Sequence, residues 1–300
     1  MANYLGIEIA PDAVRGVLIK TALRKVQIAR FHEVPILATS PVEAPDVAVE
    51  GDGATARPEP LDPIQIAVQE LVRSMGLPRP SIFASLPGEE ASMRRIELPA
   101  AVARKIDELL PIEMEALVPF DADETMLDHQ PIEIADGKLH TLVVAIPKDR
   151  VRGHLDQLAG WGADPQELAV GAAALDGLAQ VIPALATEGP HLVIHLGARR
   201  VDACVLRRGH IELARTISAG ISDVADAGFA SSGGFGSEFA GSAAERLSRE
   251  LRQTLTAWRM GGGDAPVAIH VSGYGVHDER VARWVGEVLS RDVEVLAVPD

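Results

Sequence analysis

The chain has 300 residues and a mass of 31.8 kDa, more than one small core usually organises, so we expect two domains or a domain with an insertion. Hydrophobic residues make up 47% and charged residues 24%, which are ordinary values for a folded protein and exclude global disorder. The formal net charge is −15, with 28 Lys and Arg against 43 Asp and Glu, which disfavours binding to nucleic acid or to anionic lipid.

The single cysteine points to a reducing compartment, and the apolar runs are too short for a transmembrane segment. Cys204 is the only cysteine, which excludes an internal disulfide, a thiolate zinc site and an iron–sulfur cluster built by this chain. The amino-terminal sequence lacks the basic and apolar segments of a secretory signal. No apolar run reaches the roughly 18 residues needed to span a bilayer. We therefore expect membrane attachment only through a partner or through a segment outside this sequence.

The opening of the chain is rich in β-branched residues, which predicts an antiparallel three-stranded meander. Its strands are expected over residues 4–9, 14–20 and 26–34. Residues 39–63 contain five prolines and no aromatic residue, and predict a disordered excursion. Helical spacing over 64–75, ending at Gly76, and an apolar stretch over 81–86 then predict a helix that returns to a fourth strand.

The middle of the chain predicts a compact α+β insertion with its own small core. It is expected to contain a strand ending at Leu98, a helix over 101–117, a hairpin of strands 126–134 and 139–146, and a helix over 149–161. The hairpin is the strongest of these signals, because Asp136-Gly137 is a favoured two-residue turn. An Ala- and Leu-rich stretch over 171–185 predicts one further helix.

A second meander then repeats the opening theme. Its strands are expected over residues 191–196, 201–206 and 211–217. Residues 226–241 are rich in Gly and Ser and predict a mobile stretch. Ser242 and Glu245 have the spacing of a capping box, which begins a helix to Met260. A strand over 266–272, a helix over 277–290 and a strand over 293–298 are expected to finish the chain. The recurrence predicts two related halves that face each other across a cleft.

Turns at equivalent places in such halves can hold phosphates through backbone N–H groups, with a carboxylate nearby for hydrated magnesium. Glycines in a third turn would let the backbone approach an adenine ring. The candidate residues are Glu8, Ala10, His195, Gly197, Gly273, Tyr274 and Gly275.

A series of short motifs in the middle of the chain resembles one family. The motifs are Leu86-Pro87-Gly88, then Arg94-Arg95-Ile96-Glu97-Leu98-Pro99, then Val118-Pro119-Phe120-Asp121, then Leu127-Asp128, and then the stretch Leu142 to Lys148. Their order and spacing resemble the PilM and GspL proteins of type IV pilus and type II secretion inner-membrane platforms, in the actin-like ATPase superfamily. The resemblance covers nearly the whole chain, and it does not separate PilM from GspL.

The resemblance implies an α/β, two-lobed actin-like fold, ribonuclease-H-like and duplicated, with an inserted α+β subdomain and a reduced fourth subdomain. The expected boundaries are residues 1–86 and 166–188 for the first lobe, 87–165 for the inserted subdomain and 189–300 for the second lobe. No P-loop, nucleophile elbow, HExxH motif or dinucleotide fingerprint offers an alternative enzyme class.

Four departures from the superfamily pattern fall in the nucleotide cleft. Ala10 and Pro11 stand where the first phosphate loop has Gly and a small hydroxyl residue. His195 replaces an aspartate that would organise magnesium, and Tyr274 interrupts the adenosine loop's glycines. The segment after Gly220 is too short for the helix pair that grips the nucleotide. We therefore expect no cofactor, with at most weak binding of ATP and magnesium, and no hydrolysis.

The other chemical residues have plain structural interpretations. His191 and His195 share one face of a strand and are expected to be core or cleft residues, since a metal site needs a third ligand. Cys204 is expected to be a buried, inert hydrophobe, and the three tryptophans are expected to be packing anchors.

The leading hypothesis is a non-catalytic cytoplasmic scaffold, peripheral to the bacterial inner membrane, that links platform proteins to a motor ATPase. As the resemblance implies, a groove lined by the insertion and the first half would receive a segment of a PilN- or GspM-like membrane protein, and another surface would meet a GspE-like motor. A GspL-like chain would continue past Asp300 into a transmembrane helix. The main alternative is an ATPase whose nucleotide state gates partner binding, and a sugar kinase ranks last.

Overall fold

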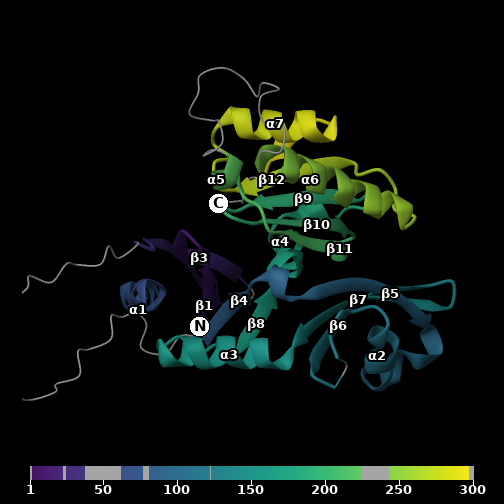
Figure 1. Ribbon diagram of the computed structural model, residues 1–300, viewed down its shortest axis with the longest axis horizontal. Coiled ribbons are helices and arrows are strands. Elements are labelled where there is room, and N and C mark those ends of the chain that lie inside the picture. The colour runs from purple at the N-terminus through teal and green to yellow at the C-terminus, as the bar shows by residue number, and fades with distance from the viewer. Residues whose placement is uncertain are drawn as a thin grey trace, which may run out of the picture. The chain divides into compact units, whose positions relative to one another are not determined.

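The computed structural model describes most of the chain, which packs as two compact units (Figure 1). The described residues are 2–22, 25–37, 62–76, 81–121, 123–224 and 243–296. Unit 1 comprises residues 1–84 and 155–167, and unit 2 comprises residues 85–154 and 168–300. The expected mobile stretch over 226–241, residue Ser242 of the expected capping box, and nearly all of the expected excursion over 39–63 lie outside the described residues.

The predicted first meander belongs to a five-stranded sheet with the strand order β3-β2-β1-β4-β8. Its strands are β1 Ala2–Ile9, β2 Ala13–Ala22, β3 Lys25–Pro35, β4 Ser81–Leu86 and β8 Glu167–Val170. Strands β1, β2 and β3 pair antiparallel, and β4 runs parallel to β1. The first four strands confirm the prediction. Strand β8 is absent from it, because four residues are too short to show a period.

Helix α1, Pro63–Met75, begins and ends where the sequence signals it. The Asp62 side chain accepts a hydrogen bond from a first-turn amide at 2.9 Å, and Gly76 ends the helix with a left-handed φ of 65°. The helix packs on the sheet at Gly16 of β2, where a Cβ atom would lie 2.9 Å from the Leu71 side chain. The absence of a side chain at Gly16 therefore lets the helix approach.

The predicted insertion contains a three-stranded sheet with the order β5-β7-β6. Its elements are β5 Ser92–Pro99, α2 Ile106–Glu115, β6 Thr125–Ala135, β7 Lys138–Pro147 and α3 Lys148–Gly160. The predicted turn is confirmed, with positive φ at both Asp136 (50°) and Gly137 (74°). Buried side chains from β5, α2 and β7, including Leu98, Leu110 and Val143, form the expected small core.

Two predicted helices are interrupted. The helix expected over 101–117 begins as a 3-10 helix, Ala100–Lys105, and becomes α2 only after Lys105 leaves helical geometry. The helix expected over 171–185 is wrong as a continuous element. It divides into a 3-10 helix Gly171–Gly177, a single turn α4 Leu178–Val181 and a 3-10 helix Pro183–Ala186. Pro183 disfavours helical geometry at the residue before it, which has φ −120° and ψ 90°.

The second meander belongs to a five-stranded sheet with the order β11-β10-β9-β12-β13. Its elements are β9 His191–Leu196, β10 Val201–Arg207, β11 His210–Ile217, α5 Ile221–Val224, α6 Ala243–Met260, β12 Ala268–Gly273, α7 Glu279–Leu289 and β13 Glu294–Val295. The strand order repeats that of the first sheet, and so do the directions of the first four strands, which confirms the predicted duplication.

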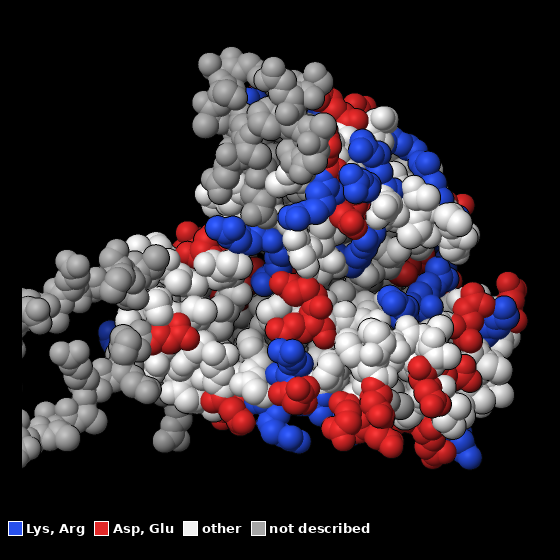
Figure 2. Space-filling view, in the orientation of Figure 1, with Lys and Arg blue, Asp and Glu red and all other residues white. Residues whose placement is uncertain are grey.

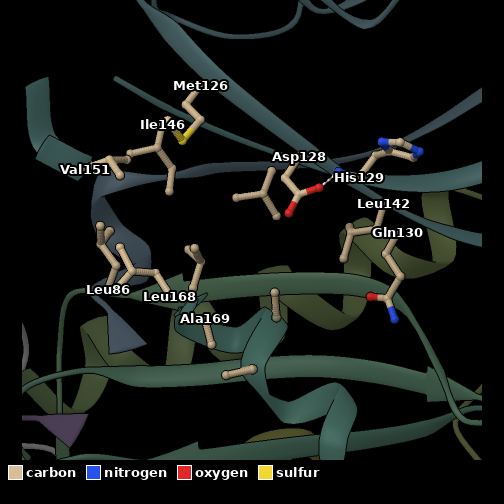
Figure 3. A pocket seen from close by; sticks show the side chains of 14 residues that line it. Leu86, Met126, Asp128, His129, Gln130, Leu142, Ile146, Val151, Leu168 and Ala169 are labelled. Atoms are coloured by element: carbon tan, nitrogen blue, oxygen red, sulfur yellow. Dashed lines mark hydrogen bonds between the residues drawn. The ribbon is translucent and has the colours of Figure 1, made fainter. Parts of the chain in front are cut away.

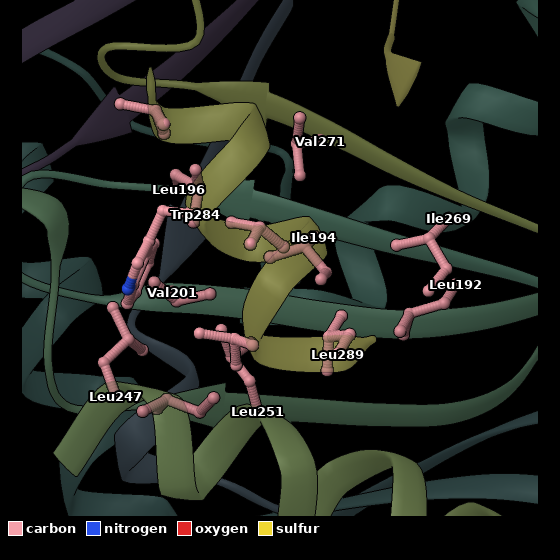
Figure 4. Packing of buried hydrophobic residues seen from close by; sticks show 14 of the residues in the cluster. Leu192, Ile194, Leu196, Val201, Leu247, Leu251, Ile269, Val271, Trp284 and Leu289 are labelled. Carbon is pink, nitrogen blue, oxygen red and sulfur yellow. The ribbon is translucent and has the colours of Figure 1, made fainter. Parts of the chain in front are cut away.

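Helices α6 and α7 cover one face of this second sheet (Figure 4). Leu247 and Leu251 of α6 and Trp284 of α7 pack against Ile194 and Val201 of the strands. The cluster explains why the helices keep strict apolar spacing, since each must bury one stripe. Within the part of the chain that the structure describes, no helix has both the length and the apolar character needed to cross a membrane.

Candidate functional site

The two site residues predicted for the first lobe lie at the end of β1, in unit 1. Glu8 is the cross-strand neighbour of Arg15, and its carboxylate lies 4.0 Å from the guanidinium. That guanidinium also donates to Asp12 and Glu33 at 2.7 Å each. The Ala10 amide donates to a carbonyl three residues along the chain at 3.0 Å. Glu8 therefore belongs to an ion cluster centred on Arg15, and the Ala10 amide is used inside its own turn.

His195 and Gly197 lie in unit 2, where β9 turns into β10. The His195 Nδ1 lies 3.1 Å from the hydroxyl of Ser272, at the end of the neighbouring parallel strand β12. The Gly197 amide donates to the Arg200 carbonyl at 2.8 Å and closes the hairpin turn. This position therefore presents an imidazole nitrogen, whereas the hard magnesium ion prefers oxygen ligands.

The turn predicted for adenosine lies directly beside this hairpin. Gly273 has a φ of 96°, and a Cβ atom there would lie 2.9 Å from the His195 ring. The Tyr274 amide donates to the Leu196 carbonyl at 2.6 Å, while its ring is half exposed. Gly275 also has a positive φ, 74°, and its carbonyl accepts a hydrogen bond from the amide of Asp278, the residue immediately before α7. The two glycines are therefore required by backbone geometry alone.

Amides at the start of α5 point into the same hairpin turn. The Ile221 amide donates to the Gly197 carbonyl and the Ser222 amide to the Ala198 carbonyl, each at 2.9 Å. In a phosphate site, amides at such a helix start would be directed at the ligand. Here both are already bonded to the chain itself.

One acidic residue of this region is missing from the predicted site. Asp202 of β10 is the cross-strand neighbour of His195 and is buried. Its carboxylate accepts a hydrogen bond from the Thr216 hydroxyl and lies 3.7 Å from the Arg200 guanidinium. Burial raises its pKa, against the opposing effects of Thr216 and Arg200. The sequence signal that could have located it is strand register, which places it beside His195.

The structure thus brings the five predicted residues of the second lobe together and shows Glu8 and Ala10 in the other unit. Among the described residues, no group of three His, Cys, Asp or Glu side chains is arranged to hold a metal ion. Burial raises the pKa of the Cys204 thiol, so that residue is the inert hydrophobe the sequence predicts.

A cavity of about 250 Å³ is the second candidate site, and it lies wholly within unit 2 (Figure 3). Its walls come from the end of β4, from β6, β7, the start of α3, β8 and the 3-10 helix that follows β8. Most of the lining is aliphatic. The lining residues are Leu86, Met126, Asp128, His129, Gln130, Leu142, Val144, Ile146, Val151, Leu168, Ala169, Val170, Ala173 and Ala174.

The polar lining residues gather at one end of the cavity (Figure 3). The Asp128 carboxylate accepts the His129 amide at 2.7 Å. The His129 ring lies 3.5 Å from the exposed carboxylate of Asp107 on α2. Gln130 donates from its side-chain amide to Asp176 at 2.8 Å. The cavity therefore offers an apolar floor with an acidic end.

A close crossing of three backbone segments positions the cavity wall. A Cβ atom at Gly171 would lie 3.0 Å from the amide nitrogen of Gly88 and 2.7 Å from the Thr216 hydroxyl. Leu86 lies two residues before Gly88, and Val170 lies immediately before Gly171; both side chains line the cavity. Only glycine fits at both positions, so the Pro-Gly motif after β4 is needed for this contact.

Comparison with known protein families shows which family the chain belongs to. A family model described as type IV pilus assembly protein PilM matches residues 6–246. The chain belongs to the PilM family. This confirms the resemblance seen in the sequence and places the chain among type IV pilus assembly proteins and their type II secretion relatives.

One curated relative comes from type II secretion. The type II secretion system protein L of Xanthomonas campestris pv. campestris is 26% identical to this PilM-family chain over 111 residues. That stretch is 37% of this chain, and it spans 29% of the relative's length.

Two solved structures share the fold of this PilM-family chain. The PilM-PilN type IV pilus biogenesis complex has a TM-score of 0.70 at 19% identity, covering 98% of this chain and 88% of that one. The cytoplasmic domain of EpsL, an inner-membrane component of the type II secretion system of Vibrio cholerae, has a TM-score of 0.51 at 11% identity, covering 91% and 82%. Together with the duplicated sheets, these likenesses confirm the predicted two-lobed actin-like fold.

Proposed function

We propose that this PilM-family chain is a non-catalytic cytoplasmic scaffold at the inner-membrane platform of a bacterial type IV pilus or type II secretion system. The apolar cavity of unit 2 is the observation that carries the proposal. Its volume of about 250 Å³ suits a few aliphatic side chains of an extended segment. The segment would belong to a PilN- or GspM-like membrane protein. A PilM-PilN complex among the structural relatives supports such a partner.

The charge around the cavity favours a partner segment with basic flanks. Asp128 and His129 lie at the polar end of the lining, and the carboxylate of Asp107 lies 3.5 Å from the His129 ring. Exposed acidic residues continue along α2, at Glu108 and Glu113, and acidic side chains gather on this part of the surface (Figure 2). With a net charge of −15 for the whole chain, such a surface would steer basic segments towards the cavity.

We further propose that the turns predicted to hold a nucleotide bind ATP and magnesium weakly or not at all and perform no hydrolysis. Support comes from the amides of Gly197, Tyr274 and Ile221, which are bonded within the chain, and from a histidine in the magnesium position. Phosphoryl transfer depends on donors and a metal held in place, so their loss removes most of the catalysis.

A second surface would contact a GspE-like motor ATPase, as the resemblance implies, which makes the chain a link between membrane platform and motor. Pull-down of the purified motor ATPase by this chain, with and without the membrane partner's cytoplasmic segment, tests this part separately. If the chain links membrane platform and motor, the chain, the motor ATPase and the membrane partner's segment should form a ternary complex. Competition between the two partners for the chain would contradict it.

The cavity proposal is tested with a fluorescent peptide that copies the cytoplasmic segment of the PilN-type protein. Ala169 is an exposed residue of the lining, so Ala169→Trp fills the cavity without disturbing a core. We expect it to weaken peptide binding at least about tenfold in fluorescence anisotropy. Ala101→Trp, at an exposed position outside the lining, is the matched control and should bind as wild type. Equal binding by both variants would refute the cavity as the docking site.

The nucleotide proposal is tested by thermal unfolding with Mg-ATP. A ligand at about 100 times its dissociation constant stabilises a protein by about 2.7 kcal/mol. We expect no shift of the melting temperature at millimolar Mg-ATP. A clear, saturable shift would favour the alternative of an ATPase whose nucleotide state gates partner binding.

A further inference from the structure

Strand β3 is an outer strand of its sheet, with no hydrogen-bonded neighbour on its far side among the residues that the structure describes. Register with β2 places Phe31 beside Val17 and Ile28 beside Ile19, and Val26 lies on the same side two residues before Ile28. The three β3 side chains are 61%, 52% and 62% exposed in chain order. They form an apolar stripe along an open edge of the sheet, defined as Val26, Ile28 and Phe31.

The stripe faces away from α1. Gly16, on the opposite face of the sheet, packs beneath Leu71 of that helix. Arg30 also lies on the α1 side, where its guanidinium donates to the Ser74 carbonyl at 2.7 Å. The helix that buries one face of the β2–β3 ribbon therefore leaves the stripe uncovered.

A β-bulge at Ala29 creates the stripe. Ile19 pairs with Ile28 and Leu18 pairs with Arg30, so Ala29 has no partner on β2. In a regular strand, Ile28 and Phe31 would point to opposite faces, because their separation is an odd number of residues. The extra residue turns Phe31 to the same face as Ile28, which is the known effect of a bulge on side-chain direction.

The edge of β3 is also self-complementary. An antiparallel copy related by a two-fold axis between Ile28 and Ala29 would place Val26 opposite Phe31 of the second copy, and Phe31 opposite Val26. Aromatic and β-branched residues are favourable cross-strand pairs. On the other face, Gln27 would lie opposite Arg30 of the copy, so no like charges meet across this pair. Such an isologous contact closes on itself.

We propose that β3 is a homodimer interface, in which the β3 strands of two copies pair antiparallel and join their sheets. The contact is one strand wide, so the dimer is weak and its population depends on concentration. The inference is independent of the cavity and of the nucleotide cleft, since it uses only residues of β2, β3 and α1 in unit 1.

Paired cysteine variants test the register directly. In the proposed dimer, position 26 lies opposite position 31 of the copy, whereas the two positions 26 are five residues apart, about 17 Å at about 3.4 Å per residue. A mixture of Val26→Cys and Phe31→Cys chains should therefore form a disulfide under mild oxidation, and neither variant alone should. The native Cys204 is fully buried and does not interfere. Crosslinking of either variant with itself, or none in the mixture, would overturn this register.

Sedimentation velocity from about 5 to about 200 µM tests the interface itself, because weak contacts need high concentration. Wild type should shift towards a dimer, and Phe31→Asp should raise the dissociation constant at least about tenfold, since it removes both Val–Phe pairs. Ile112→Asp, at a 68% exposed position of α2, is the matched control and should dimerise as wild type. A wild type that stays monomeric, or a control that loses dimerisation equally, would refute the proposal.

Discussion

The two five-stranded sheets share one topology and differ at their third strands. In both, three antiparallel strands are followed by a fourth strand that runs parallel to the first of them, and the orders are β3-β2-β1-β4-β8 and β11-β10-β9-β12-β13. Ile211 of β11 is fully buried, whereas Ile28 of β3 is 52% exposed. The same chain path thus produces one covered edge and one open edge.

The inserted subdomain explains why the β11 edge is covered. Strand β11 carries Glu212, a buried carboxylate that lies 3.7 Å from the guanidinium of Arg95 on β5 and 3.7 Å from that of Arg207 on β10. Thr216, at the other end of β11, lies at the crossing of Gly88 and Gly171. An edge strand presents unpaired polar groups, so proteins cover it or blunt it. Here the inserted subdomain covers β11.

The largest expected effect comes from truncating the same residue type on the two third strands. Ile211→Ala leaves a cavity in a closed core, so we expect a loss of about 2–5 kcal/mol in the free energy of unfolding. Ile28→Ala, measured at low protein concentration, removes an exposed side chain and should cost about 0.5 kcal/mol or less. Urea unfolding followed by circular dichroism measures both. Similar losses would mean that the β3 edge is covered in solution by the chain itself.

A smaller effect separates two glycines with positive φ. Gly171→Ala adds backbone strain at φ 38° and a Cβ atom 3.0 Å from the Gly88 amide nitrogen, so we expect a loss of about 1–3 kcal/mol. Gly76→Ala, at φ 65° with nothing within 4 Å of its Cβ, adds strain alone and should cost about 1 kcal/mol. The same urea titration compares the two. A larger cost at Gly76 would contradict the close packing of the crossing.

A third effect depends on pH and belongs to the second sheet. His191 Nδ1 lies 3.1 Å from His270 Nε2, with the Thr187 hydroxyl 2.6 Å from His191 and the Glu294 carboxylate 3.6 Å from His270. Burial lowers the pKa of both imidazoles, and the neighbouring His270 lowers that of His191 further. The unfolded chain therefore binds protons at a higher pH than the folded chain.

Stability from this pair is consequently present above about pH 6.5 and is lost as pH falls below it, by up to about 1.4 kcal/mol per pH unit for each extra proton bound by the unfolded chain. We expect His270→Gln to flatten the dependence of unfolding free energy on pH between about pH 7 and about pH 5. His277→Gln, at an exposed position, is the control and should follow the wild type. A variant with an unchanged slope would show that the pair does not titrate on unfolding.

Much of the architecture follows from local sequence pattern. Alternation and turn chemistry predict both meanders, the Asp136-Gly137 hairpin and the ends of α1, because these depend on residues close together in the chain. The continuous helix predicted over 171–185 is wrong because that prediction, too, used only local composition. Its composition favours a helix, and the geometry imposed by Gly171 and Pro183 overrides that propensity.

The candidate sites divide in the same way. Motif comparison locates His195, Gly197 and Gly273, which the structure brings together. Asp202 is missed, because its place beside His195 depends on cross-strand register. The cavity is lined by residues from 86 to 174, and no linear pattern records which of their side chains converge.

The sequence by itself determined the duplicated α/β plan and the family, since each depends on the type and spacing of nearby residues. Only the tertiary structure decided which sheet edge is buried, how Gly88 meets Gly171, and where an apolar cavity opens. These features arise from contacts between segments far apart in the chain, where packing selects among arrangements that local propensity leaves equally favourable.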